Sequence, residues 1–222
     1  MLSFIIPVYN QDVILFDKVL RALTTQSLKD YEAIFVLDGP NPSAEQAIRR
    51  VFKKVPNHYK ILAYEHGGVQ KARNTGFQYS TGNYVIFMDS DVIIEPHTAL
   101  AWVEILDKNP DVGFVYSGYR FLNEQGAIDS EDFDPWTLMV RNYISSCFPL
   151  RRGLVPVWNE MLESLQDWDF WLSVVEKGGK GKFLPGHAWS TAYPTPKSIS
   201  GQGCTPDKWL DRMDKVKSLH NI

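Results

Sequence analysis

The feature that most constrains the fold is a regular alternation of short apolar runs and longer amphipathic runs in the first half of the chain. The apolar runs are rich in β-branched and aromatic residues, as strands are, and the runs between them have helical spacing. We expect strands at Leu2–Val8, Tyr31–Leu37, Lys60–Glu65, Asn83–Met88 and Val112–Leu122, and helices at Asp12–Gln26, Ser43–Lys54, Gly68–Ser80 and His97–Lys108. This alternation predicts an α/β fold with a mostly parallel central sheet and helices on both faces.

The second half of the chain is less regular. One helical run, Gln166–Gly179, places Trp168 and Trp171 on a single apolar face. A last amphipathic helix is expected over 205–222, packed on the domain through Trp209, Leu210, Met213 and Val216. Because no linker separates the halves, we predict one domain over 1–222, in which the irregular half forms the second wall of a cleft.

Composition excludes some classes of function. The 222 residues carry a formal net charge of −3 without a block of Lys or Arg, which argues against nucleic acid as a partner. The two cysteines, Cys147 and Cys204, are far apart, as expected of free thiols in a reducing compartment. No apolar stretch reaches the roughly 18 residues that span a bilayer. We therefore expect no transmembrane segment and a cytoplasmic protein, either free or peripheral to a membrane.

Polar clusters follow each of the first four predicted strands. They are Tyr-Asn, Asp-Gly, His-Gly-Gly and Asp-Ser-Asp in chain order. The carboxyl ends of parallel strands lie at one edge of a sheet, and ligands of open α/β sheets bind there. The sequence therefore predicts a binding site made by these four clusters.

The triplet Asp89-Ser90-Asp91 is the most informative of these clusters. An acid-x-acid pattern also occurs at Asp30–Glu32, Asp129–Glu131, Asp132–Asp134 and Asp167–Asp169, and most such pairs are solvated turn acids or helix caps. Only Asp89 and Asp91 end a strongly apolar strand, where two carboxylates would repel each other without a cation. Their oxygen atoms suit Mn²⁺ or Mg²⁺, ions that commonly bridge to substrate phosphates.

Five segments in order resemble one known family. "SFIIPVYN", "VLDGP", "GGVQKARNTGF", "YVIFMDSDVII" and "LQDWDFWLSVVEKGG" look like the family-two inverting nucleotide-sugar glycosyltransferases, which have the GT-A fold. The resemblance implies transfer of a sugar from a nucleotide-diphosphate donor, usually a UDP-sugar, to an acceptor hydroxyl. It also implies a nucleotide-binding half over about 1–95 and an acceptor-side half over about 96–200.

The resemblance further implies a role for individual residues. Pro7 and Tyr9 would line the base, Asp38 would hydrogen-bond it, and Arg73 and Asn74 would line the donor pocket. Within the acidic triplet, Asp89 and Ser90 would contact the donor. Asp91 would bind the metal, together with Asp89. Asp167 would be the general base. The chain departs from the family pattern at Leu37 and Gln166, where acids are common. The segment "YPTPKSISG" lacks the family's frequent histidine, for which His187 is a weak substitute.

Several alternatives stay open on the residues alone. Asp167 could instead close a capping box with Ser164, and Asp169 is a rival for the base. Trp158 is the candidate for an acceptor contact, because Trp168 and Trp171 share a core-facing helical stripe. A non-catalytic nucleotide-sugar or glycan-binding module, or a nucleotidyltransferase, would also use such a sheet.

Overall fold

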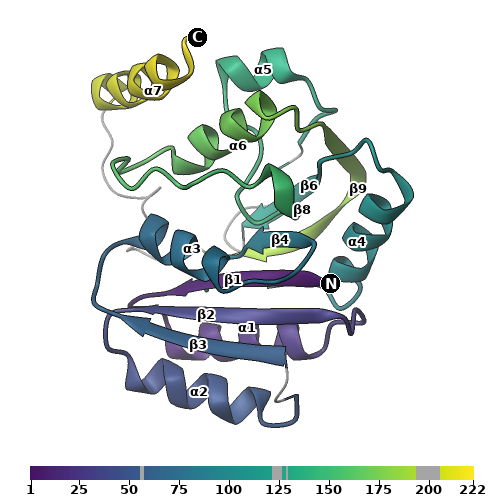
Figure 1. Ribbon diagram of the computed structural model, residues 1–222, viewed down its shortest axis with the longest axis vertical. Coiled ribbons are helices and arrows are strands. Elements are labelled where there is room, and N and C mark those ends of the chain that lie inside the picture. The colour runs from purple at the N-terminus through teal and green to yellow at the C-terminus, as the bar shows by residue number, and fades with distance from the viewer. Residues whose placement is uncertain (56–57, 122–126, 129, 194–205) are drawn as a thin grey trace.

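The structure is a computed structural model that describes residues 1–55, 58–121, 127–128, 130–193 and 206–222. The first half alternates strands and helices as the sequence predicts. Its elements are β1 (Leu2–Val8), α1 (Val13–Thr24), β2 (Tyr31–Asp38), α2 (Pro42–Phe52), β3 (Tyr59–Tyr64), α3 (Val69–Gln78), β4 (Tyr84–Phe87), β5 (Val92–Ile94) and α4 (Thr98–Lys108). Figure 1 shows β1 to β3 side by side, with α1 and α2 on one side of them.

The second half adds shorter and less regular pieces. They are β6 (Phe114–Phe121), β7 (Ala127–Ile128), α5 (Pro135–Val140), β8 (Leu150–Arg151), the short 3₁₀ helix η2 (Arg152–Leu154), α6 (Gln166–Glu176), β9 (Gly181–Ala192) and α7 (Pro206–His220). In Figure 1, α5, α6 and α7 lie together at the opposite end of the molecule from α2.

All nine strands of the described residues belong to one sheet. Its order is β3-β2-β1-β4-β8-β6-β9-β5, with β7 paired to β6. The pairs among β1 to β4 are all parallel, whereas β8 and β5 are antiparallel to their neighbours and β6 is parallel to β9. The α/β fold class is confirmed, and the parallel part puts four strand ends at one edge.

Alternate residues of β2 pack against helices on opposite faces of the sheet. Phe35 meets Phe16 of α1 and Phe52 of α2 edge to face, with ring centroids 6.3 Å and 5.3 Å away. Ile34 and Val36 point the other way and form a separate cluster with Ala72 of α3. This period of two explains why β2 is apolar throughout: both of its faces are covered.

Gly76 lets α3 approach the sheet closely. A Cβ atom there would collide with the side chains of Ile5 and Val36, so α3 packs closer than another residue would allow. Arg73, one turn earlier on the same helix, is thereby placed beside the carboxyl end of β4. The close approach ties the core packing of α3 to the position of a charged side chain.

The start of the second helix and the packing of the last helix differ from the sequence prediction. The second helix begins at Pro42 with Asn41 as its cap, because the Asn41 side chain accepts a hydrogen bond from Ala44 N. Proline suits the first helical position, so Ser43 lies inside the helix and forms no capping box. In α7, Val216 is buried and Met213 half-buried, but Trp209 and Leu210 are exposed, which corrects the expected packing of those two residues. Among the described helices, none has the length and apolar character needed to cross a membrane.

Candidate active site

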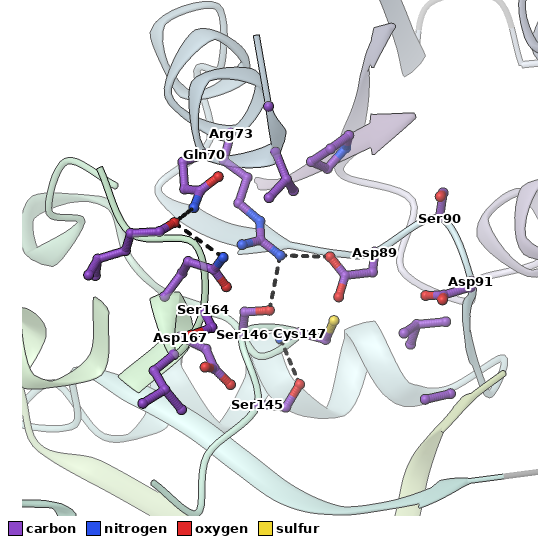
Figure 2. A pocket seen from close by; sticks show the side chains of 18 of the residues that line it. Gln70, Arg73, Asp89, Ser90, Asp91, Ser145, Ser146, Cys147, Ser164 and Asp167 are labelled. Carbon is purple, nitrogen blue, oxygen red and sulfur yellow. Dashed lines mark hydrogen bonds and ion pairs between the residues drawn. The ribbon is translucent and has the colours of Figure 1, made fainter. Parts of the chain in front are cut away.

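The strand ends open into one large cavity. Its volume is about 1340 Å³. The residues of the first half of the chain that line it include Pro7, Tyr9, Asp38, Asp89, Ser90 and Asp91. The second half closes the cavity with Asn142, Ser145, Ser146 and Asp167, and with Trp209, Arg212 and Met213 of α7. Residues far apart in the chain thus form two walls of one site, as Figure 2 shows from close by.

Asp38 organises the ends of β2 and β3. Its two oxygen atoms accept hydrogen bonds from the backbone amides of Gly67 and Gly68 at 2.7 Å and 3.1 Å, and His66 Nδ1 lies 3.0 Å away. The His66 ring stacks on Tyr9 with centroids 4.2 Å apart and planes 14° apart. Gly68 has a φ of 95°, a left-handed backbone that glycine adopts without strain, and it starts α3. Asp38 therefore fixes the loop that leads into α3, and its carboxylate lies at the cavity.

Arg73 is the central cation of the site. Its guanidinium group donates to Asp89 Oδ1 at 2.7 Å and to Ser146 Oγ at 3.4 Å (Figure 2). It also lies 4.2 Å from the Trp158 ring centroid. Only 6% of Arg73 is exposed, and its Nε atom has no hydrogen-bond partner. A charge that is buried in this way interacts strongly with the acids around it.

Asp91 has a different environment from Asp89. Within the described part of the chain no Lys, Arg or His forms an ion pair with its carboxylate, whereas Arg73 neutralises Asp89. Burial, and then the nearby charge of Asp89, raise the pKa of Asp91 to about 6. A carboxylate kept beside a second acid without a cation fits a cation ligand, so Asp91 is suited to that role.

The protein alone offers few ligands for a metal. Among the described residues no group of three or more His, Cys, Asp or Glu side chains could hold an ion. This sparse donor set suits an ion such as Mg²⁺ that takes one or two carboxylates and completes its shell with substrate phosphates and water. His187 lies in β9 with its side chain outside the described atoms, and most of the "YPTPKSISG" segment lies outside the described residues.

Asp167 lies on the first turn of α6 and faces the cavity. Its Oδ2 accepts a hydrogen bond from Asn142 Nδ2 at 2.9 Å, and its Oδ1 accepts one from Trp168 N at 3.0 Å. Burial raises the pKa of Asp167, and the Arg73 charge opposes part of that rise. A base with a raised pKa that is still ionised accepts a proton more readily near neutral pH.

The capping-box interpretation of Asp167 is wrong. The residue at the cap of α6 is Leu165, which has a left-handed φ of 57° and makes no side-chain capping hydrogen bond. Such a backbone is uncommon for leucine, and it turns the chain into α6 directly before Asp167. The Asp167 oxygen atoms are used by Asn142 and Trp168 instead of the Ser164 amide.

The rival acid Asp169 faces away from the cavity. It is buried and lies 3.0 Å from His220 Nε2, at the end of α7. His220 Nδ1 in turn lies 2.7 Å from Glu176 of α6. Asp169 does not line the cavity, so of the two acids only Asp167 is placed to meet a ligand there.

Two predicted contacts are placed differently by the structure. Trp158 is 2% exposed and stacks on Phe170 with ring centroids 4.2 Å apart, so it supports Arg73 from the core and cannot meet an acceptor. The Asn74 side chain donates to Trp158 O at 3.0 Å and accepts from Trp158 N at 2.8 Å. Asn74 therefore anchors the Trp158 backbone and is not among the residues that line the cavity.

Sequence reasoning missed Asn142 and Ser146. Both lie in the irregular segment between α5 and β8, where they contact Asp167 and Arg73. Nothing in the spacing of "NYISSC" identifies them. The available signal for Ser146 is its place in a short polar stretch between two residues that the structure buries, Ile144 and Phe148. Asn142 lies before that stretch and has no such signal.

An α/β sheet whose parallel strands end at an acid-lined cavity defines a protein that binds its ligand at that edge. The model of the glycosyl transferase family 2 matches residues 3–153, so the chain belongs to this family. The resemblance drawn from the sequence is confirmed.

Curated relatives are similar over most of this chain. An uncharacterized glycosyltransferase of Rickettsia conorii is 30% identical over 192 residues, which are 78% of this chain and 31% of the relative. The chondroitin synthase of Escherichia coli is 25% identical over 80% of this chain and 27% of its own length. The chain spans 20% to 31% of the length of the first three curated relatives that it matches.

Solved structures share the fold. S. aureus TarS 1-349 in complex with UDP-GlcNAc has a TM-score of 0.77 at 19% identity, covering 98% of this chain and 65% of that one. The mannosyltransferase PcManGT from Pyrobaculum calidifontis, in complex with GDP-Man and Mn2+, has a TM-score of 0.68 at 16% identity, covering 97% and 69%. These likenesses agree with the single α/β domain of the GT-A type that the sequence predicts.

Proposed function

We propose that this chain transfers a sugar, with inversion, from a nucleotide-diphosphate donor to an acceptor hydroxyl. The observation that carries the proposal is the position of its acids on two walls of one cavity. Asp89 and Asp91 follow β4, whereas Asp167 comes from α6. Inversion by a single displacement requires a leaving-group side and a base side, and the two walls supply one each.

The donor side is assigned to the first half of the chain. We infer that about 1–95 bind the nucleotide, with Pro7, Tyr9 and Asp38 around the base, and that the donor is a UDP-sugar. The complex of TarS with UDP-GlcNAc supports a UDP donor, although the GDP-Man complex of PcManGT shows that the fold accepts another base.

Asp91, with Asp89 beside it, would hold Mn²⁺ or Mg²⁺ against the diphosphate. A bound divalent cation would neutralise the negative charge that accumulates on the departing diphosphate. Arg73 holds Asp89 in place at 2.7 Å and adds positive charge on the same side. The Mn2+ in the PcManGT complex supports this assignment.

Asp167 would accept the proton of the acceptor hydroxyl as that oxygen attacks the sugar. Asn142 orients the carboxylate through its 2.9 Å hydrogen bond. The proton then resides on an Asp167 oxygen, and the buried position that raises the pKa of this acid favours the transfer.

Nucleotide binding and chemistry can be tested separately. The full chain is first heated with a panel of nucleotide sugars and Mn²⁺, and the donor is the compound that raises the melting temperature most. Donor turnover is then measured for the wild type and for Asp167→Asn. We expect Asp167→Asn to bind the donor as well as the wild type does and to lose turnover.

These measurements, with an assay for pyrophosphate release, identify the alternatives. Donor binding without turnover in the wild type would show a binding module. Pyrophosphate release from a nucleoside triphosphate and a sugar phosphate would show a nucleotidyltransferase. Full turnover by Asp167→Asn would refute the base assignment.

A further inference from the structure

The cavity has more space than one nucleotide sugar needs. Ligand pockets commonly measure roughly 300–1,000 Å³, whereas this cavity measures about 1340 Å³. Its lining extends from the ends of β1 to β4 as far as α7, the last helix of the chain. The cavity can therefore hold a second ligand beside the donor.

Trp209 is an exposed aromatic side chain in the wall of this cavity. Among the large exposed apolar residues of the described chain, only Tyr9 and Trp209 line the cavity, at 53% and 45% exposure. Trp136 is more exposed, at 74%, but lies on α5 outside the lining. An indole face that is left in contact with solvent inside a cavity is a large, rigid surface for binding.

The position of Trp209 is fixed relative to the proposed base. Helix α7 packs on α6, and its Val216 is fully buried. His220 lies between Asp169 and Glu176 of α6 at 3.0 Å and 2.7 Å. Asp167 is on the first turn of that same α6. The two helices therefore form one wall, which carries both the base and the exposed indole.

This placement distinguishes the acceptor from the donor. The base must lie on the acceptor side, opposite the departing diphosphate, so a residue on the wall of the base faces the acceptor. A sugar ring presents a flat face of C–H groups and an edge of hydroxyl groups. The flat face matches the indole of Trp209 beside Met213, and the hydroxyl edge matches the polar side chains of Ser164 and Gln166, which also line the cavity.

We propose that Trp209 is an acceptor-binding residue and that the acceptor is a carbohydrate whose ring stacks on its indole. This inference rests on the proposed glycosyl transfer and goes beyond it, because it names the class of acceptor and a residue that selects it. It also replaces Trp158, which is buried, as the aromatic contact for the acceptor.

The test uses saturation-transfer NMR on the full chain with Mg²⁺ and UDP. The probes are the methyl glycosides of glucose, galactose, mannose and N-acetylglucosamine, and the disaccharide chitobiose. We expect the C–H protons of at least one probe to receive saturation from the wild type. Trp209→Ala should weaken that binding about tenfold, whereas Trp209→Phe should retain most of it, because a smaller aromatic face remains.

Two controls separate this inference from a structural effect. Trp136→Ala removes an even more exposed tryptophan outside the cavity and should leave glycoside binding unchanged. The affinity for UDP should be the same in all variants. Glycoside binding that persists in Trp209→Ala, an equal loss of UDP affinity, or no binding of any probe would overturn the proposal.

The proposed function has its own readouts. If the wild type neither binds UDP with Mg²⁺ nor turns over a donor, the glycosyl transfer itself is refuted. If UDP binding and turnover hold and no glycoside depends on Trp209, the acceptor inference alone fails.

Discussion

The Asp91 carboxylate should weaken the fold of the metal-free protein, and Asp91→Asn tests this directly. Its pKa rises from 3.8 to about 6 on folding, because it is buried and lies near Asp89. The ionised form is therefore disfavoured in the folded state by about 3 kcal/mol. Asn has nearly the same shape without the charge, so the variant should be more stable by about that amount at pH 7.5.

The pH dependence gives the sign of the effect. The folded state holds the proton more tightly than the unfolded chain, so the cost is absent below the unfolded pKa of 3.8 and complete above about 6. The stability difference between Asp91→Asn and the wild type should fall to about half at pH 5. At pH 7.5 the melting temperature of the variant should be higher by roughly 6–12 °C, at about 2–4 °C per kcal/mol for a chain of this size.

Urea unfolding in EDTA at pH 7.5 and pH 5 measures this difference. The exposed Asp111→Asn serves as a matched control and should change stability little at either pH. Addition of Mn²⁺ with UDP should then stabilise the wild type and not Asp91→Asn, and donor turnover should be lost in the variant. The reasoning is refuted if Asp91→Asn is no more stable than the wild type at pH 7.5, or if the gap does not change with pH.

Three further substitutions test the second wall of the site. Arg73→Gln removes a charge that lowers the pKa of Asp167, so the acid limb of the plot of kcat/KM against pH should move to higher pH. An acid limb at the same pH as in the wild type would contradict this. Asn142→Ala removes the hydrogen bond that orients the Asp167 carboxylate, so kcat should fall about 10-fold to 100-fold in a turnover assay while the UDP affinity, measured by calorimetry, is retained. An unchanged kcat would contradict the orienting role. His220→Ala removes the contact with Asp169 that holds α7 on α6, so the KM for the acceptor should rise while the UDP affinity stays constant. An equal loss of UDP affinity would show general unfolding instead.

The first half of the fold could be predicted from the sequence because its strands are buried on both faces. Residues such as Ile34 and Phe35 are both apolar although they face opposite helices, so the strand appears as an uninterrupted run with clear ends. The helix starts were less predictable. Asn41 caps α2 through its side chain, and Leu165 starts α6 through a left-handed backbone without a side-chain hydrogen bond. A serine three residues before an acid or amide reveals neither of these starts.

The candidate site was predictable where it follows strand ends and not where it lies in irregular segments. Asp38, Asp89 and Asp91 were found because the topology fixes where parallel strands end. No periodicity locates Asn142, whose partner Asp167 is 25 residues away in the chain. Trp158 was misassigned because the groups that bury it, Arg73 and Phe170, come from distant segments.

The close approach of α3 to the sheet affects the distance between the charged groups of the cavity. The hydrogen bond from Arg73 to Asp89 is 2.7 Å long, and such contacts weaken when they stretch by a few tenths of an ångström. One turn further along α3, the missing Cβ of Gly76 allows the helix to lie this close to Ile5 and Val36 of the sheet. The distance between the charges in the cleft thus depends in part on the apolar side of the helix, where a carbon atom is absent at a position that does not line the cavity.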